Sequence, residues 1–141
     1  MLALVPSRKH KVFIVWTYEQ SSGRIIKEGI GILATGYSGA MGYKNDVMMQ
    51  NIENKGPIPC GMYRIGAPRD TTTHGPYVLP LEPDHRNEMF GRHSFFIHGD
   101  SIERLGFASE GCIVLPKFAR ERIYESGDHD LQVVKELEMT A

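Results

Sequence analysis

Two residues of the chain have side chains that could act together as a base and a nucleophile. His98 ends the hydrophobic run FFIH, immediately before Gly99, and Cys112 stands in a Gly-Cys pair fourteen positions later. An ordinary thiol is mostly protonated at neutral pH, and a neighbouring imidazole is the usual group that removes its proton. A glycine before the cysteine, Gly111, lets backbone amides approach a reacting carbonyl, as an oxyanion hole requires. The pattern predicts a catalytic Cys112–His98 pair, with Gly99 and Gly111 at the two turns.

Each of the two residues has a simpler interpretation when it is taken alone. A free cysteine is commonly a small buried hydrophobe, and a histidine at the end of a strand is commonly a satisfied core or edge residue. Their occurrence together, each beside a glycine, favours the catalytic interpretation. The imidazole then needs an orienting group, for which the candidates are the backbone carbonyl of Gly99 and the side chain of Asp100.

The remaining cysteine and a second nearby histidine indicate no metal site. The chain has two cysteines, Cys60 and Cys112, and no CxxC pair, which excludes a zinc ribbon. Cys60 is interpreted as structural. Because side chains alternate along a strand, His93 and His98 are expected on opposite faces, where they could not share an ion. We therefore expect neither a metal nor another cofactor.

The length and composition predict one soluble globular domain over residues 1–141. Sixteen Lys and Arg residues against seventeen Asp and Glu residues give a net charge of −1, which indicates neither nucleic-acid binding nor attraction to a membrane. No stretch approaches the ~20 apolar residues of a membrane helix. The N-terminus, MLALVPSRKHKVF, puts its short apolar start before its basic cluster, the reverse of a secretory signal. Synthesis in the cytoplasm without a signal peptide is expected, with export by another route.

Short segments rich in β-branched and aromatic residues predict a mainly β fold, a sandwich or a barrel, with one surface helix. Pro116 and Gly127 bracket the helix, PKFARERIYESG. The first two strands are expected to form a hairpin around the SSG turn, and a short helix or an extended piece is expected after Asn45. Strand segments are predicted at 11–19, 24–39, 61–65, 76–83, 93–99, 111–115 and 130–137.

Two motifs in order resemble a known enzyme family. IHGD…SEGCIVLP, around His98 and Cys112, resembles the His-Gly and Ser/Thr-x-Gly-Cys signature of the L,D-transpeptidases, and GPIPCGMYRI at 56–65 resembles their Pro-x-Gly-aromatic segment. GYSG at 36–39 and the IVLP after Cys112 are most similar to one branch, the small toxins that attack peptidoglycan and that bacteria deliver by type VI secretion. The resemblance runs from about residue 33 to residue 122.

The resemblance implies a β domain of the L,D-transpeptidase type that cleaves peptidoglycan stem peptides, with Cys112 as nucleophile, His98 as base, and the amides of Cys112 and Gly111 holding the oxyanion. It implies a periplasmic site of action in target bacteria, with a cognate immunity protein and a component of the secretion apparatus as partners. A housekeeping L,D-transpeptidase and a binding module with an inert cysteine are the alternatives. The substrate-binding residues expected on this basis are Tyr37, Asp100, Ser109 and Arg120.

Two positions depart from the family pattern. Glu110 stands where members carry His, Lys or Arg before the Gly-Cys, and Val114 stands where they carry Arg or Asn. The cation that pairs with a substrate carboxylate must then come from elsewhere, and the candidates are Arg104, Arg120 and Arg122. Arg120 is the first choice, because it lies near the start of the predicted helix, while Arg122 points about 200° away around it.

Overall fold

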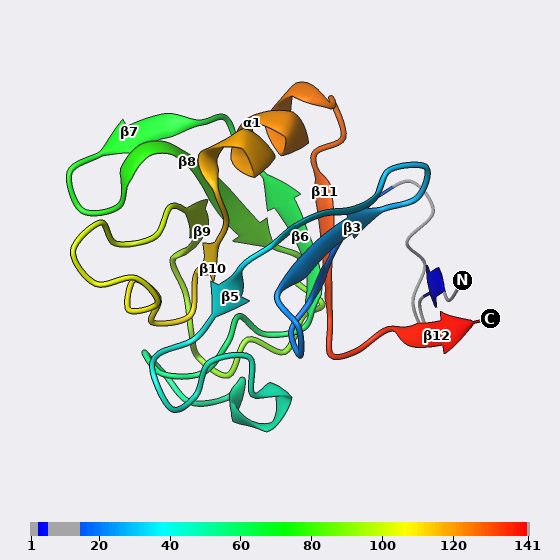
Figure 1. Ribbon diagram of the computed structural model, residues 1–141. Helices are drawn as coiled ribbons and strands as arrows, with labels where there is room; N and C mark the ends of the chain where they lie inside the picture. Colours follow the sequence, from blue (N-terminus) through cyan, green and yellow to red (C-terminus); the bar gives the residue numbers. More distant parts are fainter. Residues whose placement is uncertain (1–2, 6–14, 141) are drawn as a thin grey trace.

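A computed structural model describes residues 3–5 and 15–140, and its main feature is one mixed sheet (Figure 1). The strand order is β4-β3-β2-β11-β6-β8-β9-β10-β5, and β7 pairs with β8 outside this path. The β9–β10 and β11–β2 pairs are parallel, and the other pairs are antiparallel. The strands of this sheet are β2 (Trp16–Glu19), β3 (Arg24–Lys27), β4 (Gly31–Thr35), β5 (Tyr37–Ser38), β6 (Gly61–Ile65), β7 (Arg69–Thr71), β8 (Gly75–Pro83), β9 (Phe95–His98), β10 (Ile113–Val114) and β11 (Asp130–Val134).

The two ends of the sheet are joined by a single residue, Gly36. β4 is the strand at one edge and β5 the strand at the other, yet they follow each other directly in the chain. Within the described residues, the sheet therefore curls until its edges meet, as in a barrel, instead of forming the two stacked sheets of a sandwich. Gly36 N donates to Gly23 O at 2.7 Å on one side. On the other side, a Cβ at Gly36 would lie 1.7 Å from Val114 O, so only glycine fits there.

Side chains two positions apart fill the interior of the curled sheet, as the alternation of strand side chains requires. Burial of each apolar side chain contributes roughly 1.5–3 kcal/mol. Six strands or strand ends each contribute a pair to one core cluster: Trp16 and Tyr18, Tyr63 and Ile65, Leu79 and Leu81, Phe95 and Ile97, Ile113 and Leu115, Leu131 and Val133.

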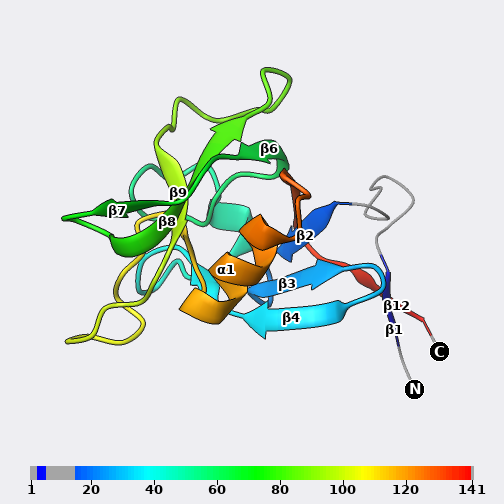
Figure 2. The ribbon, with the colours of Figure 1, turned by 90° about the horizontal axis from the view of Figure 1, so that it is seen from above.

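The single predicted helix is present as α1 (Lys117–Glu125), with Pro116 as its N-cap. Ala119 and Ile123, four residues apart, lie on its buried face, and the helix packs against β8 and β9 (Figure 2). This confirms a helix on the surface of the sheet. The short helix expected after Asn45 is the 3₁₀ turn η1 (Val47–Met49).

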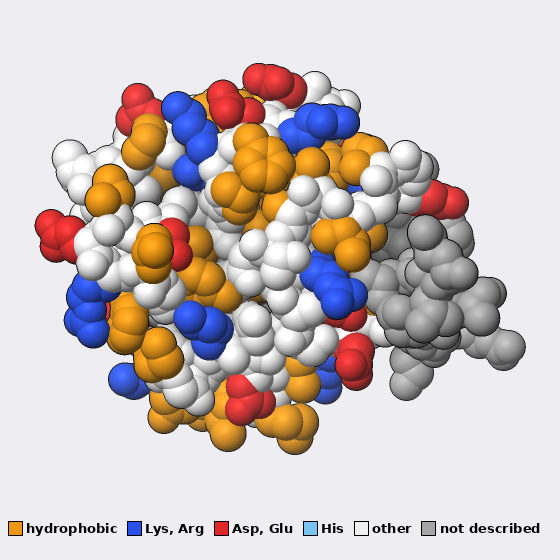
Figure 3. All heavy atoms as spheres, viewed as in Figure 1, with side chains coloured by type: hydrophobic (Ala, Val, Ile, Leu, Met, Phe, Trp, Pro, Cys, Tyr) orange, Lys and Arg blue, Asp and Glu red, His pale blue; other side chains and the backbone are white. Residues whose placement is uncertain are grey.

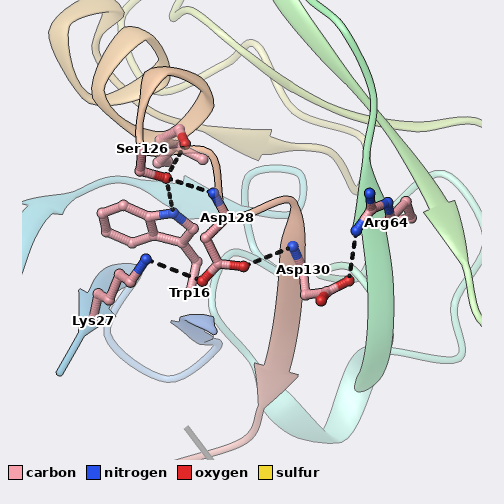
Figure 4. Close-up of polar contacts among 7 residues, drawn as sticks. Trp16, Lys27, Arg64, Ser126, Asp128 and Asp130 are labelled. Atoms are coloured by element: carbon pink, nitrogen blue, oxygen red, sulfur yellow. Dashed lines mark hydrogen bonds and ion pairs between the residues drawn. The ribbon is translucent and has the colours of Figure 1, made fainter. Parts of the chain in front are cut away.

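A polar cluster fastens the turn between α1 and β11 to the sheet (Figure 4). Ser126 Oγ accepts from Trp16 Nε1 at 3.1 Å and donates to Ile123 O at 2.6 Å. Asp128 pairs with Lys27 at 3.1 Å, and Lys27 Nζ also lies 5.1 Å from the centre of the Trp16 ring. These contacts fix where the helix ends relative to β2 and β3.

Most predicted strands are confirmed, and one was wrong. The hairpin of β2 and β3 and the strands at 61–65 and 76–83 are present, and the segment at 130–137 is a strand only as far as Val134. The segment 24–39 is not one strand: positive φ angles at Gly29 (87°) and Gly31 (83°) turn the chain between β3 and β4. Of the strand predicted at 11–19, residues 11–14 lie outside the described residues.

A small separate sheet of β1 (Ala3–Val5) and β12 (Glu138–Thr140) lies beside both termini. Figures 1 and 2 place it on the side of the molecule opposite the loop between β9 and β10. On the face drawn in Figure 3, acidic and basic side chains are interspersed with hydrophobic ones. No helix within 3–5 and 15–140 is long and apolar enough to cross a membrane.

Candidate active site

The spacing between His98 and Cys112 follows from the parallel pairing of β9 and β10. His98 ends β9, and the chain must return along that strand before β10 can run beside it in the same direction, with Val114 opposite His98 and Ile113 opposite Ile97. Such a parallel connection needs about a dozen residues or more. The return leaves Cys112 just before β10, beside the strand that carries His98.

The imidazole of His98 is buried and held in one tautomer. His98 is 2% exposed, and its Nδ1 lies 2.8 Å from Gly99 O. Because a carbonyl can only accept, Nδ1 carries the proton and Nε2 of the neutral ring is left as the base. Of the two orienting groups considered, the structure uses the Gly99 carbonyl.

The thiol of Cys112 is protonated in the resting site. Burial raises the pKa of Cys112 to about 11, against the opposing effects of the Phe96 amide and the Arg92 charge. Its Sγ lies 3.8 Å from Ser94 O, to which a thiol can donate. Burial also lowers the pKa of His98. The two groups therefore rest as a neutral pair and not as a thiolate and an imidazolium.

His98 and Cys112 line the same cavity, of about 430 Å³. His93 also lines it, although alternation predicted that His93 would face away from His98. The alternation does not apply, because β9 begins only at Phe95 and Ser94 has a φ of 67°. Within the described ranges, no three His, Cys, Asp or Glu side chains are grouped as a metal site would require. The other lining residues are Glu53, Asn54, Thr73, His74, Arg92, Ser94, Phe95, Phe107, Ala108, Glu110 and Gly111.

The predicted oxyanion hole is changed by Ser109. Gly111 N donates to Ser109 Oγ at 3.0 Å, so this amide already has a partner. Ser109 Oγ also accepts from Gly39 N at 2.9 Å and donates to Cys112 O at 2.6 Å. Ser109 is 3% exposed, and its hydroxyl bonds to the protein itself instead of facing a substrate. The Cys112 amide is left as the candidate oxyanion donor.

Tyr37 and Asp100, also predicted to bind substrate, fasten the loop that carries the cysteine. Tyr37 OH donates to Asp100 Oδ1 at 2.6 Å and accepts from Ala108 N at 2.9 Å. The same carboxylate accepts from the amides of Ser101 and Gly106 at 2.8 and 3.1 Å. These bonds, with the Asp100 pKa below its ordinary value, keep the carboxylate ionised within the loop. Both side chains therefore position the loop.

Arg104, Arg120 and Arg122 all lie in the described part of the chain, and of the three Arg120 alone lines one of the two cavities that contain His98. Arg120 is buried, and its Nη1 donates to Pro76 O at 2.8 Å and to Tyr77 O at 3.0 Å. Its Nη2 lies against Gly99, where a Cβ would come within 3.0 Å. Much of the guanidinium is thus used to hold the start of β8. Arg104 and Arg122 are exposed, and Arg104 lies over the Phe107 ring.

A family model for the Tlde1 domain matches residues 33–137, which include His98 and Cys112. The chain belongs to the Tlde1 domain family. This is a type VI secretion effector family, which agrees with the branch that the sequence motifs resemble. No curated protein and no solved structure matches the chain.

Two residues of this Tlde1 domain that sequence reasoning missed lie against the predicted pair. Arg92 is 6% exposed and donates to four backbone carbonyls, among them those of Gly56 at 2.9 Å and Glu110 at 3.4 Å. Gly111 is needed beside it, because a Cβ there would lie 2.4 Å from Arg92 Nη2. The ring of His74 stacks on the ring of His98. Neither residue belongs to a motif that could have indicated its role.

Proposed function

We propose that this Tlde1 domain is a cysteine-dependent enzyme that cleaves peptidoglycan stem tetrapeptides between the L-centre of diaminopimelate and the terminal D-alanine. The observation that supports it most is the shared cavity of His98 and Cys112, with Nδ1 of His98 held by Gly99 O and Nε2 left as the base. The resemblance of the motifs to L,D-transpeptidases supplies the substrate class.

The neutral resting pair dictates the first step. Nε2 of His98 takes the thiol proton as Sγ of Cys112 attacks the carbonyl, so no stable thiolate is required beforehand. The Cys112 amide is the donor for the oxyanion that forms. The C–N bond to D-alanine then breaks, the leaving amine takes the proton from His98, and the stem remains on Cys112 as a thioester.

The second step returns the enzyme to its resting state. His98 takes a proton from an acceptor, which attacks the thioester, and Sγ leaves with that proton as a thiol. Water as acceptor gives L,D-carboxypeptidase activity, a free D-amino acid gives exchange, and another stem amine gives a cross-link. A second cavity, of about 650 Å³, is lined by Lys117 and Arg120 together with Asp100 and Glu103. Its two cations are the proposed partners of stem-peptide carboxylates, which would be costly to bury unpaired.

Within an effector family, trimming and exchange would deprive a target cell of the tetrapeptide donors its wall requires. The proposed place of action is therefore the periplasm of a target bacterium. A cognate immunity protein and a component of the secretion apparatus are the proposed protein partners.

A non-catalytic peptidoglycan-binding module is the second candidate, and the raised pKa of the Cys112 thiol favours it. An inert buried cysteine would share that property. Iodoacetamide separates the two: a catalytic Cys112 should be alkylated faster than Cys60, whose pKa burial also raises to about 11 and whose Sγ lies 3.3 Å from Gln20 Oε1. Equal, slow labelling of both cysteines would favour the binding module.

The decisive experiment is incubation with purified disaccharide tetrapeptides, with and without a free D-amino acid, followed by mass analysis. The wild type should yield tripeptide and the exchanged tetrapeptide. Cys112→Ala and His98→Ala should each abolish both products, because nucleophile and base act as a unit. Cys60→Ala is the matched control and should retain most activity. Product from Cys112→Ala, or none from Cys60→Ala, would show that the wrong cysteine has been assigned.

A further inference from the structure

Two cavities meet at the imidazole of His98. The first contains Cys112, and the second extends over Gly99 and Lys117 toward α1. Five residues line both cavities: Thr73, His74, His98, Phe107 and Ala108.

His74 is the member of that set with a direct contact to the base. Its ring centre lies 4.5 Å from that of His98, and the two planes are inclined by only 18°. The ring also lies 5.6 Å from the ring of Phe96. Two stacked rings at this distance attract each other beyond the effect of the area that the contact buries.

The turn between β7 and β8 is built to hold His74 in this place. His74 N donates to Thr71 Oγ1 at 2.8 Å, and the guanidinium of Arg69 on β7 lies 5.5 Å from the centre of the Phe96 ring. Arg69, Phe96, His74 and His98 thus form a row of planar groups from two elements. Figures 1 and 2 show that the β7–β8 hairpin projects on the same side of the molecule as the loop between β9 and β10.

Nδ1 of His98 has one hydrogen bond, to Gly99 O, and a single bond leaves the plane of the ring free to rock about it. A second ring against its face removes that freedom. The charged or titratable groups that act on His98 are His74 from the hairpin, Arg120 from α1 and Asp100 from the loop. Cys112 lines the same cavity as His98. Positive charge on His74 and Arg120 opposes protonation of His98, and Asp100 favours it.

We propose that His74 is a positioning residue that stacks on His98 and keeps Nε2 of the base directed at Cys112. The inference rests on the proposed Cys112–His98 chemistry. It assigns to the β7–β8 hairpin the function of holding the base.

The test compares the rate of Cys112 alkylation by iodoacetamide as a function of pH in the wild type, His74→Ala and His74→Phe. His74→Ala should lower the rate at about pH 8 by roughly 10- to 100-fold, the cost of a misplaced catalytic group. It should also move the acid limb to higher pH, because burial lowers the pKa of His98 and removal of the stacked ring lessens that burial. His74→Phe keeps the ring and should restore the rate to within about threefold.

Alkylation needs no peptidoglycan, so the role of His74 can be contradicted while the proposed substrate stands, and the reverse. His98→Ala reports whether the base acts on Cys112 at all, and His85→Ala, on an exposed turn, is the matched histidine control. Slow alkylation in His98→Ala together with wild-type behaviour in His74→Ala would overturn the role of His74 alone. Equal impairment of His74→Phe and His74→Ala would also overturn it, because the ring would then not be the acting feature. His74→Gln replaces His74→Ala if the latter does not fold.

Discussion

Burial acts in opposite senses on the two reacting groups of the site. It raises the pKa of Cys112 to about 11 and lowers that of His98 from its ordinary 6.5. In both cases the charged form is disfavoured, because it is poorly solvated among protein groups. Over the physiological range the neutral thiol and the neutral imidazole coexist, and in the proposed reaction the proton moves only when Sγ attacks.

The pH dependence of activity should follow from the need for a neutral His98 imidazole as the base. Since its pKa lies below 6.5, the active neutral ring persists below that pH, and kcat/KM should decrease only as the pH falls through the lowered pKa. A profile of kcat/KM measured between about pH 4 and pH 8 checks this. An acid limb centred above the ordinary histidine value would contradict the assignment of a buried His98 as the base.

At the scale of elements, the connection between β9 and β10 does more than return the chain. Hydrogen bonds hold the connection together and tie it to the β5 region. Tyr37 on β5 and Asp100 hold its first half, and Ser109 holds the turn before Cys112. Buried polar groups must have such partners, and here the partners set the position of Cys112. Tyr37, Asp100 and Ser109, three of the residues predicted to bind substrate, make these bonds.

Replacing Ser109 with Ala should therefore affect both stability and chemistry. Two backbone amides and the Cys112 carbonyl lose their partner in a buried place, which should cost about 1–3 kcal/mol in the free energy of unfolding. The rate of Cys112 alkylation should fall with it. Ser101→Ala removes an exposed hydroxyl from the same connection and is the matched control. Urea unfolding and alkylation kinetics check both, and a Ser109→Ala protein with raised KM but normal alkylation would restore the substrate-binding interpretation.

At the scale of the whole molecule, closure of the sheet at Gly36 connects the β4 edge to the strands that follow Cys112. Gly36 lies between β4 and β5, and β5 pairs with β10, which follows Cys112. The backbone of Val114 approaches so closely that no side chain can be placed between them. The curl of the sheet thus requires glycine at position 36, beside the strand that follows Cys112.

Gly36→Ala should be among the most destabilising substitutions in this chain. The added Cβ would lie 1.7 Å from Val114 O and 2.9 Å from its carbonyl carbon, so the backbone itself must shift. A loss of about 4 kcal/mol or more is expected, as for other severe core clashes. Gly66→Ala is the control, since its Cβ would meet Pro80 at an ordinary 3.4 Å. Urea unfolding followed by circular dichroism measures both, and equal stability of the two variants would contradict closure at Gly36.

Local chemistry along the chain was enough to predict much of this protein. Short segments rich in β-branched and aromatic residues predicted the strands at 61–65 and 76–83, and Pro116 and Gly127 predicted the helix, because these preferences act over a few neighbouring residues. His98, Gly99, Gly111 and Cys112 could be selected as a set because each has a residue type and a neighbour that carry chemistry. The motifs also indicated the effector family that the comparison with family models then showed.

The tertiary structure alone decided the surroundings of that pair. His74 stacks on His98, and Arg92 donates hydrogen bonds to four backbone carbonyls. These contacts join segments far apart in the chain, and no local preference encodes them. Tyr37 and Ser109 have hydroxyls that could serve a substrate or a loop equally well. Which of the two they serve depends on which backbone groups the curled sheet brings within hydrogen-bond distance, and that is a property of the closed fold.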